Sequence, residues 1–362
     1  LRWMISAIND RATEGGALPD ARNARSATEL LGASYVRQGD YDLEGALKLA
    51  QSATELAPSF GFAWVRLAEL HFSLGDPYPA RLALKRAMEL VPQHAQAHAL
   101  EGFVWSFDHR YSEALAAFET ALHLDSALAD AWLGRGLVRI RQGDRRGGNS
   151  DLLTAAGLEP ERSLLRSYLG KALAEMGEDR KALQELARAQ TLDPKDPTPP
   201  LYSALLLLTE NRVNESIREL EKSISLNTNR SVYRSQFLLD EDHAVRSSSL
   251  ARIYQAAGMD AVSLREAATA VGLDYASYSA HIFLADSYDA LRDPTRFNLR
   301  YETAWFNELL LATMLSPAGA GVVSPRFSQQ EYSQLFEQDK FGFATTTTYL
   351  GDGRLNQLAS QY

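Results

Sequence analysis

The sequence predicts an all-α fold, a right-handed α-solenoid of about eight helix pairs followed by a short C-terminal β-hairpin. Large and small apolar residues recur with a period of 34 residues, and prolines at positions 58, 92, 160 and 194 close successive units 34, 68 and 34 residues apart. Near residue 341 the apolar spacing changes to strict alternation, which is typical of strands.

The repeating unit is most regular at residues 61–94. A first helix carries large residues at unit positions 4 and 11 and a small one at position 8, here Trp64, His71 and Ala68. A second helix carries small residues at positions 20 and 27, here Ala80 and Ala87. This pattern resembles the tetratricopeptide repeat, which implies helix pairs that stack into a solenoid with a concave inner surface.

The repeats occupy two blocks separated by an insertion. The predicted organisation is a lead-in helix or linker at 1–24, six repeats at 25–228, an insertion at 229–243, two weaker repeats at 244–314, a linker with a short helix at 315–340, and a hairpin at 341–362. The insertion is either a lengthened loop or a partner-docking segment. The last repeat is degenerate and is placed by Ala285, Tyr288 and Ala304.

Composition excludes several classes of function. Acidic residues outnumber basic ones 46 to 37, so the chain lacks the basic surface that nucleic acids require. It contains no cysteine, which excludes disulfides and thiolate chemistry.

His94 and His98 share a helical spacing but have no third ligand, and we interpret them as surface histidines. With no catalytic, cofactor or metal motif, we expect a non-enzymatic protein without cofactors. The first residue is not Met and no signal-peptide pattern follows it, which indicates a trimmed chain.

The resemblance implies that unit positions 2, 5, 9, 12 and 13 of the first helices line the concave groove. The candidate partner-binding residues there are Phe62, Val65, Phe72, Phe103, Phe107, Leu133, Leu137, Ile140, Arg141, Leu201, Leu205 and Leu208. This stripe is apolar and favours an apolar or helical segment of a protein partner. The alternative is that the inner helices bury these side chains against one another. The inward basic residues Arg37, Arg141, Lys171 and Arg252 are too dispersed to form a site for acidic peptide tails.

An arginine-rich segment, residues 135–148, surrounds one helix end. It contains five arginines, which either meet an anionic partner or form a solvated face that suits a helix C-terminus.

A wider resemblance covers the C-terminal third. The stretches 229–258, 278–293 and 328–343 resemble a family of large bacterial proteins in which a periplasmic tetratricopeptide array precedes an outer-membrane β-barrel. This resemblance implies a periplasmic, outer-membrane-associated location, a barrel in the same chain and a role in export or envelope assembly, with polysaccharide as a possible ligand. The hairpin would then begin a larger sheet; alternatively it caps the last repeat or pairs with a neighbouring chain.

The predicted function is therefore a non-enzymatic scaffold for protein–protein interaction in the bacterial envelope, with self-assembly as a further possibility. The alternative is a free-standing adaptor or structural assembly subunit. An enzyme regulated by the repeats would need a catalytic domain outside this sequence.

Overall fold

The computed structural model of the chain describes residues 26–40, 42–226, 243–273, 275, 278–292, 299–315, 342–350 and 353–361. The predicted lead-in lies outside these residues, as do all of the insertion except its last residue and all of the linker except its first.

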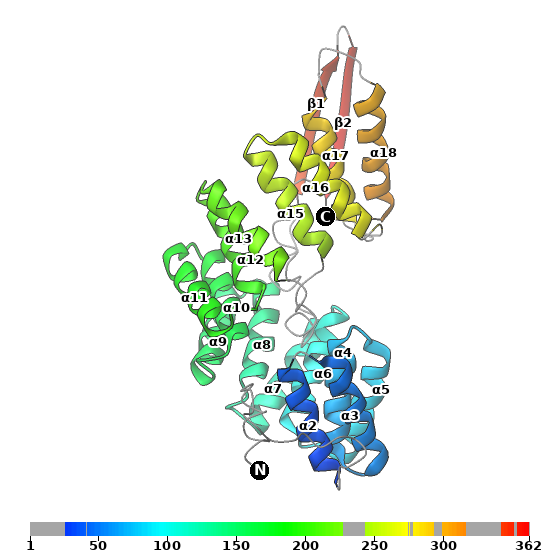
Figure 1. Cartoon of the computed structure of the whole chain (residues 1–362), viewed down its shortest axis with the longest axis vertical. Helices are drawn as coiled ribbons and strands as arrows, with labels where there is room; N and C mark the ends of the chain where they lie inside the picture. The colour runs from blue at the N-terminus through cyan, green and yellow to red at the C-terminus, as the bar shows by residue number, and fades with distance from the viewer. Residues whose placement is uncertain are drawn as a thin grey trace.

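Sixteen helices make up most of the described chain, and consecutive helices pack as pairs in an elongated array (Figure 1). The pairs before the insertion are α2 (Ala27–Gly39) with α3 (Leu43–Leu56), α4 (Gly61–Ser73) with α5 (Pro77–Leu90), α6 (Ala95–Phe107) with α7 (Tyr111–Leu124), α8 (Ala129–Arg141) with α9 (Arg145–Leu158), α10 (Ser163–Glu175) with α11 (Asp179–Leu192), and α12 (Thr198–Thr209) with α13 (Val213–Ser225). The pairs after it are α15 (His243–Ala256) with α16 (Asp260–Leu273), and α17 (Tyr278–Ala290) with α18 (Leu299–Leu315). The predicted all-α solenoid of about eight helix pairs is confirmed.

The turn inside six of these pairs depends on one residue with a left-handed backbone, at unit position 15. Four units use glycine, with φ between 71° and 94°: Gly75, Gly143, Gly177 and Gly258. Glycine adopts this conformation without a steric penalty because it has no Cβ. His109 and Asn211 take the same position in the third and sixth units, with φ of 59° and 61°. The turn geometry is thus kept where glycine is absent.

Close packing of the pairs is visible around Phe118 of α7, whose side chain is fully buried. A Cβ added at Gly102 of α6 would lie 2.6 Å from its ring, and one added at Gly134 of α8 would lie 2.2 Å away. The ring also meets that of Phe103 edge-on, with 4.9 Å between centroids. Two neighbouring first helices therefore approach α7 as closely as they do because they lack side chains at these points.

Stacking continues across the insertion. Helix α13 packs against α15, and one hydrophobic cluster includes Leu220 of α13 together with Leu250 and Ile253 of α15. The hydroxyl of Tyr254 also donates to Oε1 of Glu221 over 2.8 Å. The sixth and seventh pairs thus share a core although sixteen residues outside the described ranges separate α13 from α15.

The last pair departs from the repeat. The pattern predicts Ala304 as the small residue at the helix contact, but Ala304 is only half-buried. Ala312, eight residues later, is the fully buried alanine of α18. The weak eighth repeat is therefore out of register in its second helix.

Polar side chains add to this contact between α18 and the chain of α17. Arg292 donates to Oε2 of Glu302 over 3.3 Å, and its guanidinium lies 4.5 Å from the ring of Trp305. On the same side of α18, Oε2 of Glu308 lies 2.6 Å from Nδ1 of the buried His281.

Strands β1 (Gly342–Leu350) and β2 (Gly353–Gln361) form an antiparallel pair in which Gly342 faces Gln361 and Leu350 faces Gly353. The suggested roles of this hairpin, as a cap or as a strand for a neighbouring chain, stay predictions.

Candidate functional site

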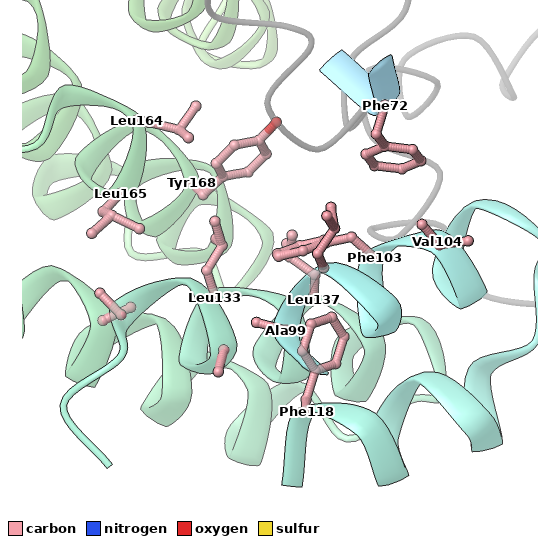
Figure 2. Packing of buried hydrophobic residues seen from close by; sticks show 14 of the residues in the cluster. Phe72, Ala99, Phe103, Val104, Phe118, Leu133, Leu137, Leu164, Leu165 and Tyr168 are labelled. Carbon is pink, nitrogen blue, oxygen red and sulfur yellow. The ribbon is translucent and has the colours of Figure 1, made fainter. Parts of the chain in front are cut away.

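Most of the predicted groove residues lie in the core. Seven of the twelve have exposed fractions of 0–4% and belong to the largest hydrophobic cluster: Val65, Phe72, Phe103, Leu133, Leu137, Ile140 and Leu201. Burial this deep leaves these side chains no surface to offer a partner. Figure 2 shows Phe72, Phe103, Leu133 and Leu137 gathered with Tyr168 from four successive repeats.

The remaining five residues are accessible to different degrees. Phe62 and Phe107 are exposed by 46% and 44%. Arg141, Leu205 and Leu208 are half-buried.

Each exposed phenylalanine rests on another ring. The ring of Phe107 meets the buried Phe72 edge-on at 6.0 Å, and that of Phe62 meets the imidazole of His94 edge-on at 4.8 Å. Phe62 is the second residue of α4 and Phe107 the last of α6. The two side chains therefore mark opposite ends of the first helices. Aromatic side chains held in this way are typical anchors of protein interfaces.

The arginine-rich segment is occupied by contacts within the fold. Arg135 binds both carboxylate oxygens of the buried Asp151 at 2.9 and 2.8 Å, and Arg139 binds Oδ2 of the same residue at 2.8 Å. Nε of Arg141 donates to the hydroxyl of Tyr111 over 3.2 Å. Arg135 and Arg139 thus join the two helices of the fourth repeat, and Arg141 joins the fourth repeat to the third, which accounts for these three arginines without an anionic partner.

His94 and His98 have separate structural roles. Nδ1 of His94 accepts from the backbone N–H of Ala97 at the start of α6. Nε2 of His98 instead lies 2.9 Å from the carbonyl oxygen of Pro92, so this nitrogen carries the proton and donates. Within the described part of the chain, no group of three or more His, Asp or Glu residues could hold a metal ion.

The bond made by His98 recurs along the array. Unit position 4 repeatedly carries an N–H that donates to the carbonyl six residues earlier. The five pairs are Trp64 with Pro58 (2.9 Å), His98 with Pro92 (2.9 Å), Trp132 with Ser126 (2.8 Å), Arg166 with Pro160 (3.0 Å) and His281 with Tyr275 (2.9 Å). Each bond fastens the start of a first helix to the turn before it. The sequence shows a side chain with a nitrogen donor at unit position 4 every 34 residues from Trp64 to Arg166. From the sequence we assigned this position only a packing role, because we considered the size of the side chain and not its hydrogen-bonding group.

Polar contacts also link the N-terminal ends of successive first helices. Nη1 of Arg162 donates to Oδ1 of Asp130 over 2.6 Å, and Oγ of Ser163 donates to Oδ2 of Asp196 over 2.8 Å. The backbone N–H of Thr198 donates to the other oxygen of Asp196 over 2.8 Å. Burial raises the pKa of Asp196 to about 6, although both hydrogen bonds favour the ionised form.

The first two repeats are joined by a buried arginine. Arg66 of α4 pairs with Oε2 of Glu69 at 3.0 Å and donates to Oγ of Ser34 over 3.1 Å and to Oε1 of Gln38 over 2.6 Å. Its guanidinium also lies 3.9 Å from the ring of Tyr35, and burial raises the pKa of that tyrosine to about 12. Arg66 and Glu69 are both buried, and this network holds the helices of the first two repeats together.

Comparison with known proteins identifies relatives of limited extent. The chain is 27% identical over 175 residues to Anaphase-promoting complex subunit 3 of Schizosaccharomyces pombe, which covers 48% of this chain and 26% of that protein. It is 27% identical over 218 residues to Cell division cycle protein 27 homolog B of Arabidopsis thaliana, which covers 57% of this chain and 29% of that protein. The chain thus spans less than a third of the length of either curated relative. No family model matches it.

Among solved structures, the APC/C hetero-tetramer Cut9-Hcn1 contains a chain that superposes with a TM-score of 0.65 at 16% identity. The match covers 80% of this chain and 53% of that one. At this identity the likeness concerns the fold alone.

The comparisons correct the expected location. Both curated relatives come from eukaryotes, and neither match points to a bacterial envelope. The prediction of a periplasmic, outer-membrane-associated protein is therefore wrong, because it rested on sequence texture between residues 229 and 343 and on no motif. In the described residues, no helix combines the length and the apolar character needed to cross a membrane.

Three observations indicate the same fold: the helix pairs, the 34-residue register in which they recur, and the superposition on another helical array. The chain therefore has the α-solenoid fold of stacked, tetratricopeptide-like helix pairs.

Proposed function

We propose that this chain is a non-enzymatic adaptor or structural subunit of a protein assembly, and that it binds a protein partner through exposed aromatic side chains at the two ends of its first helices. The observation that carries the proposal is the pair Phe62 and Phe107, two exposed rings each supported by a ring beneath it. The first curated relative adds support, since its name assigns it to a multi-subunit complex.

The proposed contact surface is narrower than the groove that the sequence predicts. It consists of the accessible members of the predicted set, which are the exposed Phe62 and Phe107 and the half-buried Arg141, Leu205 and Leu208. The seven buried positions act indirectly, because they fix the spacing between repeats. A partner segment with an apolar face would cover the two rings, and an amphipathic helix offers such a face.

Arg141 extends this surface by one repeat. It ends α8 as Phe107 ends α6, so the two residues hold the same place in consecutive units. A partner that contacts both would meet the ring of Phe107 and the half-buried Arg141, whose guanidinium is held by the hydroxyl of Tyr111.

The test is affinity purification of the tagged full-length protein from its own cells, followed by quantitative mass spectrometry. The variant Phe62→Ser/Phe107→Ser removes both rings. The matched control is Tyr78→Ser/Leu82→Ser, which removes two large side chains from α5, a second helix, that are even more exposed, by 70% and 55%. We expect a defined set of proteins to be lost with the first variant and kept with the control. Retention of the same set by both folded variants would contradict the proposed surface.

A further inference from the structure

His281 of α17 has a hydrogen-bond acceptor at each of its two ring nitrogens. Nε2 lies 2.9 Å from the carbonyl oxygen of Tyr275, and Nδ1 lies 2.6 Å from Oε2 of Glu308 in α18. The exposed fraction of the His281 side chain is 0%, so bulk solvent does not reach the ring. A neutral imidazole carries a single N–H and can donate to only one of these two oxygens. Both contacts are therefore hydrogen bonds only if the site holds a second proton.

That second proton is one more than the two side chains hold when they are apart in neutral solution. A free histidine loses its charge above about pH 6.5, and a free glutamate is ionised above about pH 4.3. The imidazole is the stronger base of the two, so the extra proton belongs on the ring. The contact is then an imidazolium that donates from Nδ1 to the Glu308 carboxylate and from Nε2 to the Tyr275 carbonyl.

Within the described residues, Glu308 is the one charged group that contacts this ring. Helices α15, α16 and α18 all pack against α17, which lies beside α18 in Figure 1. The ring of Tyr275 meets the imidazole edge-on at 5.0 Å between centroids. Other charged side chains on these helices have other partners, namely Arg265 with Glu266 on α16, Arg252 of α15 with Asp286 of α17, and Glu302 of α18 with Arg292.

We propose that His281 and Glu308 form a proton-binding joint, in which α18 stays docked on α17 while His281 carries its second proton and opens when that proton is lost. A neutral ring that still donates to Tyr275 turns the lone pair of Nδ1 toward the carboxylate, so two acceptors face each other. Moving Glu308 alone into solvent would leave Nδ1 buried without a partner, which is also costly. Opening the joint relieves both groups. Helix α18 packs mainly against α17, so it can open without separating another helix pair.

The direction of the pH dependence follows from the proton count. The docked joint binds one proton more than the open joint, so docking is favoured at low pH and weakens as pH rises above about 6.5. A difference of one proton changes the docking equilibrium by up to about tenfold per pH unit. Asp286 lies on the same helix, and burial raises its pKa to about 7, so its own titration falls in the same range. Experiments on the joint must separate the two residues.

Hydrogen exchange of the full-length protein, measured by mass spectrometry on peptides from α18 and corrected for the intrinsic effect of pH, reports docking. We expect protection of α18 to fall at least about threefold from pH 7 to pH 8 in the wild type. Glu308→Gln should remove this dependence, because its amide donates to a neutral Nδ1 without an extra proton. Glu302→Gln is the matched control, since it makes the same change on the same helix opposite Arg292, and it should keep the dependence. Asp286→Asn should keep it as well.

NMR of the full-length chain labelled with ¹⁵N at the histidine rings observes the proton itself, and His281→Gln assigns the signal. At about pH 7.5 we expect both ring nitrogens of His281 to be protonated, although a free histidine is mostly neutral there. His98 is the internal comparison. Its Nε2 makes the same bond to Pro92, but its Nδ1 is 3.5 Å from Glu101, so one protonated nitrogen is expected.

Three results would each overturn the proposal. They are a single protonated nitrogen on His281 with α18 docked, protection of α18 that does not change with pH in the wild type, and a pH dependence in Glu308→Gln equal to that of the wild type. None of them depends on capture of a partner through Phe62 and Phe107.

Discussion

Nε1 of Trp64 donates a hydrogen bond to the carbonyl oxygen of Pro58 over 2.9 Å, and the same bond spans six residues in four other repeats. It connects a helix to the turn that links it with the preceding repeat. The tryptophan, histidine and arginine at this position have different shapes but share a nitrogen donor.

Replacing Trp64 by Phe tests the importance of that donor. An aromatic ring stays but is smaller, and the N–H is lost. We expect the free energy of unfolding to fall by about 1 kcal/mol more than for a tryptophan that makes no such bond, the usual net value of a hydrogen bond. Urea unfolding measures the change. Trp105→Phe is the control. Trp105 occupies unit position 11, and its indole packs beneath the guanidinium of Arg110, so this substitution changes the ring without removing the bond made at unit position 4. An equal loss in both variants would mean that ring size matters and the bond does not.

Gly134 sets how closely α8 approaches α7. In Gly134→Ala the new Cβ would lie 2.2 Å from the buried ring of Phe118, so we expect a loss of about 1–3 kcal/mol from overpacking. In Gly157→Ala the Cβ of a helical residue meets nothing within 4 Å, and we expect a gain of up to about 1 kcal/mol.

Thermal and chemical unfolding compare the two glycine variants. Phe118→Leu combined with Gly134→Ala should recover part of the loss, because it removes the ring that the Cβ meets. A Gly134→Ala variant as stable as Gly157→Ala would show that the helices can move apart at little cost.

Arg66 and Glu69 are buried as a pair, so removing one leaves the other uncompensated. We expect Arg66→Met to cost about 3–5 kcal/mol, and Arg66→Met/Glu69→Leu to cost clearly less. A double-mutant cycle by urea unfolding gives the coupling. Additive effects of the two changes would contradict this account of the joint between the first two repeats.

Asp196 makes stability depend on pH in the unusual direction for a carboxylate. Its folded pKa is about 6 against an ordinary value of 3.8, so the folded state binds the proton more tightly than the unfolded state. This residue's contribution is therefore favourable below about pH 4 and is lost as pH rises through about 6. The difference of about two units corresponds to about 3 kcal/mol at most.

Asp196→Asn removes that titration while keeping an acceptor for Ser163. Relative to the wild type, the variant should gain stability as pH rises from about 4 to 7. Urea unfolding at several pH values measures the difference, with Glu119→Gln, an exposed residue of α7, as the control. If the free energies of unfolding of the wild type and of Asp196→Asn differ by the same amount at every pH, the raised pKa of Asp196 is ruled out as a source of pH dependence.

Sequence periodicity was sufficient to predict the helix pairs. In α4, α6, α8 and α10 the first helix starts at unit position 1, where the 34-residue register placed it. The prediction succeeded because small residues such as Gly102 and Ala80 are required at the helix contacts, and that requirement repeats.

The site was less predictable, for two physical reasons. Groove positions follow from a repeat's local geometry, but burial of Phe72 or Leu133 depends on how closely several repeats curve together. In the eighth repeat the buried alanine of α18 is Ala312 and not Ala304, and Glu302 and Glu308 add polar contacts, so the repeat period did not predict how α18 is oriented.

The most direct test of the proposed function is native mass spectrometry of the full-length protein isolated from its own cells. The account predicts a complex whose mass contains one or more other polypeptides in fixed stoichiometry. Recovery of the chain only by itself, or only as copies of itself, would contradict the proposed role as an adaptor or assembly subunit.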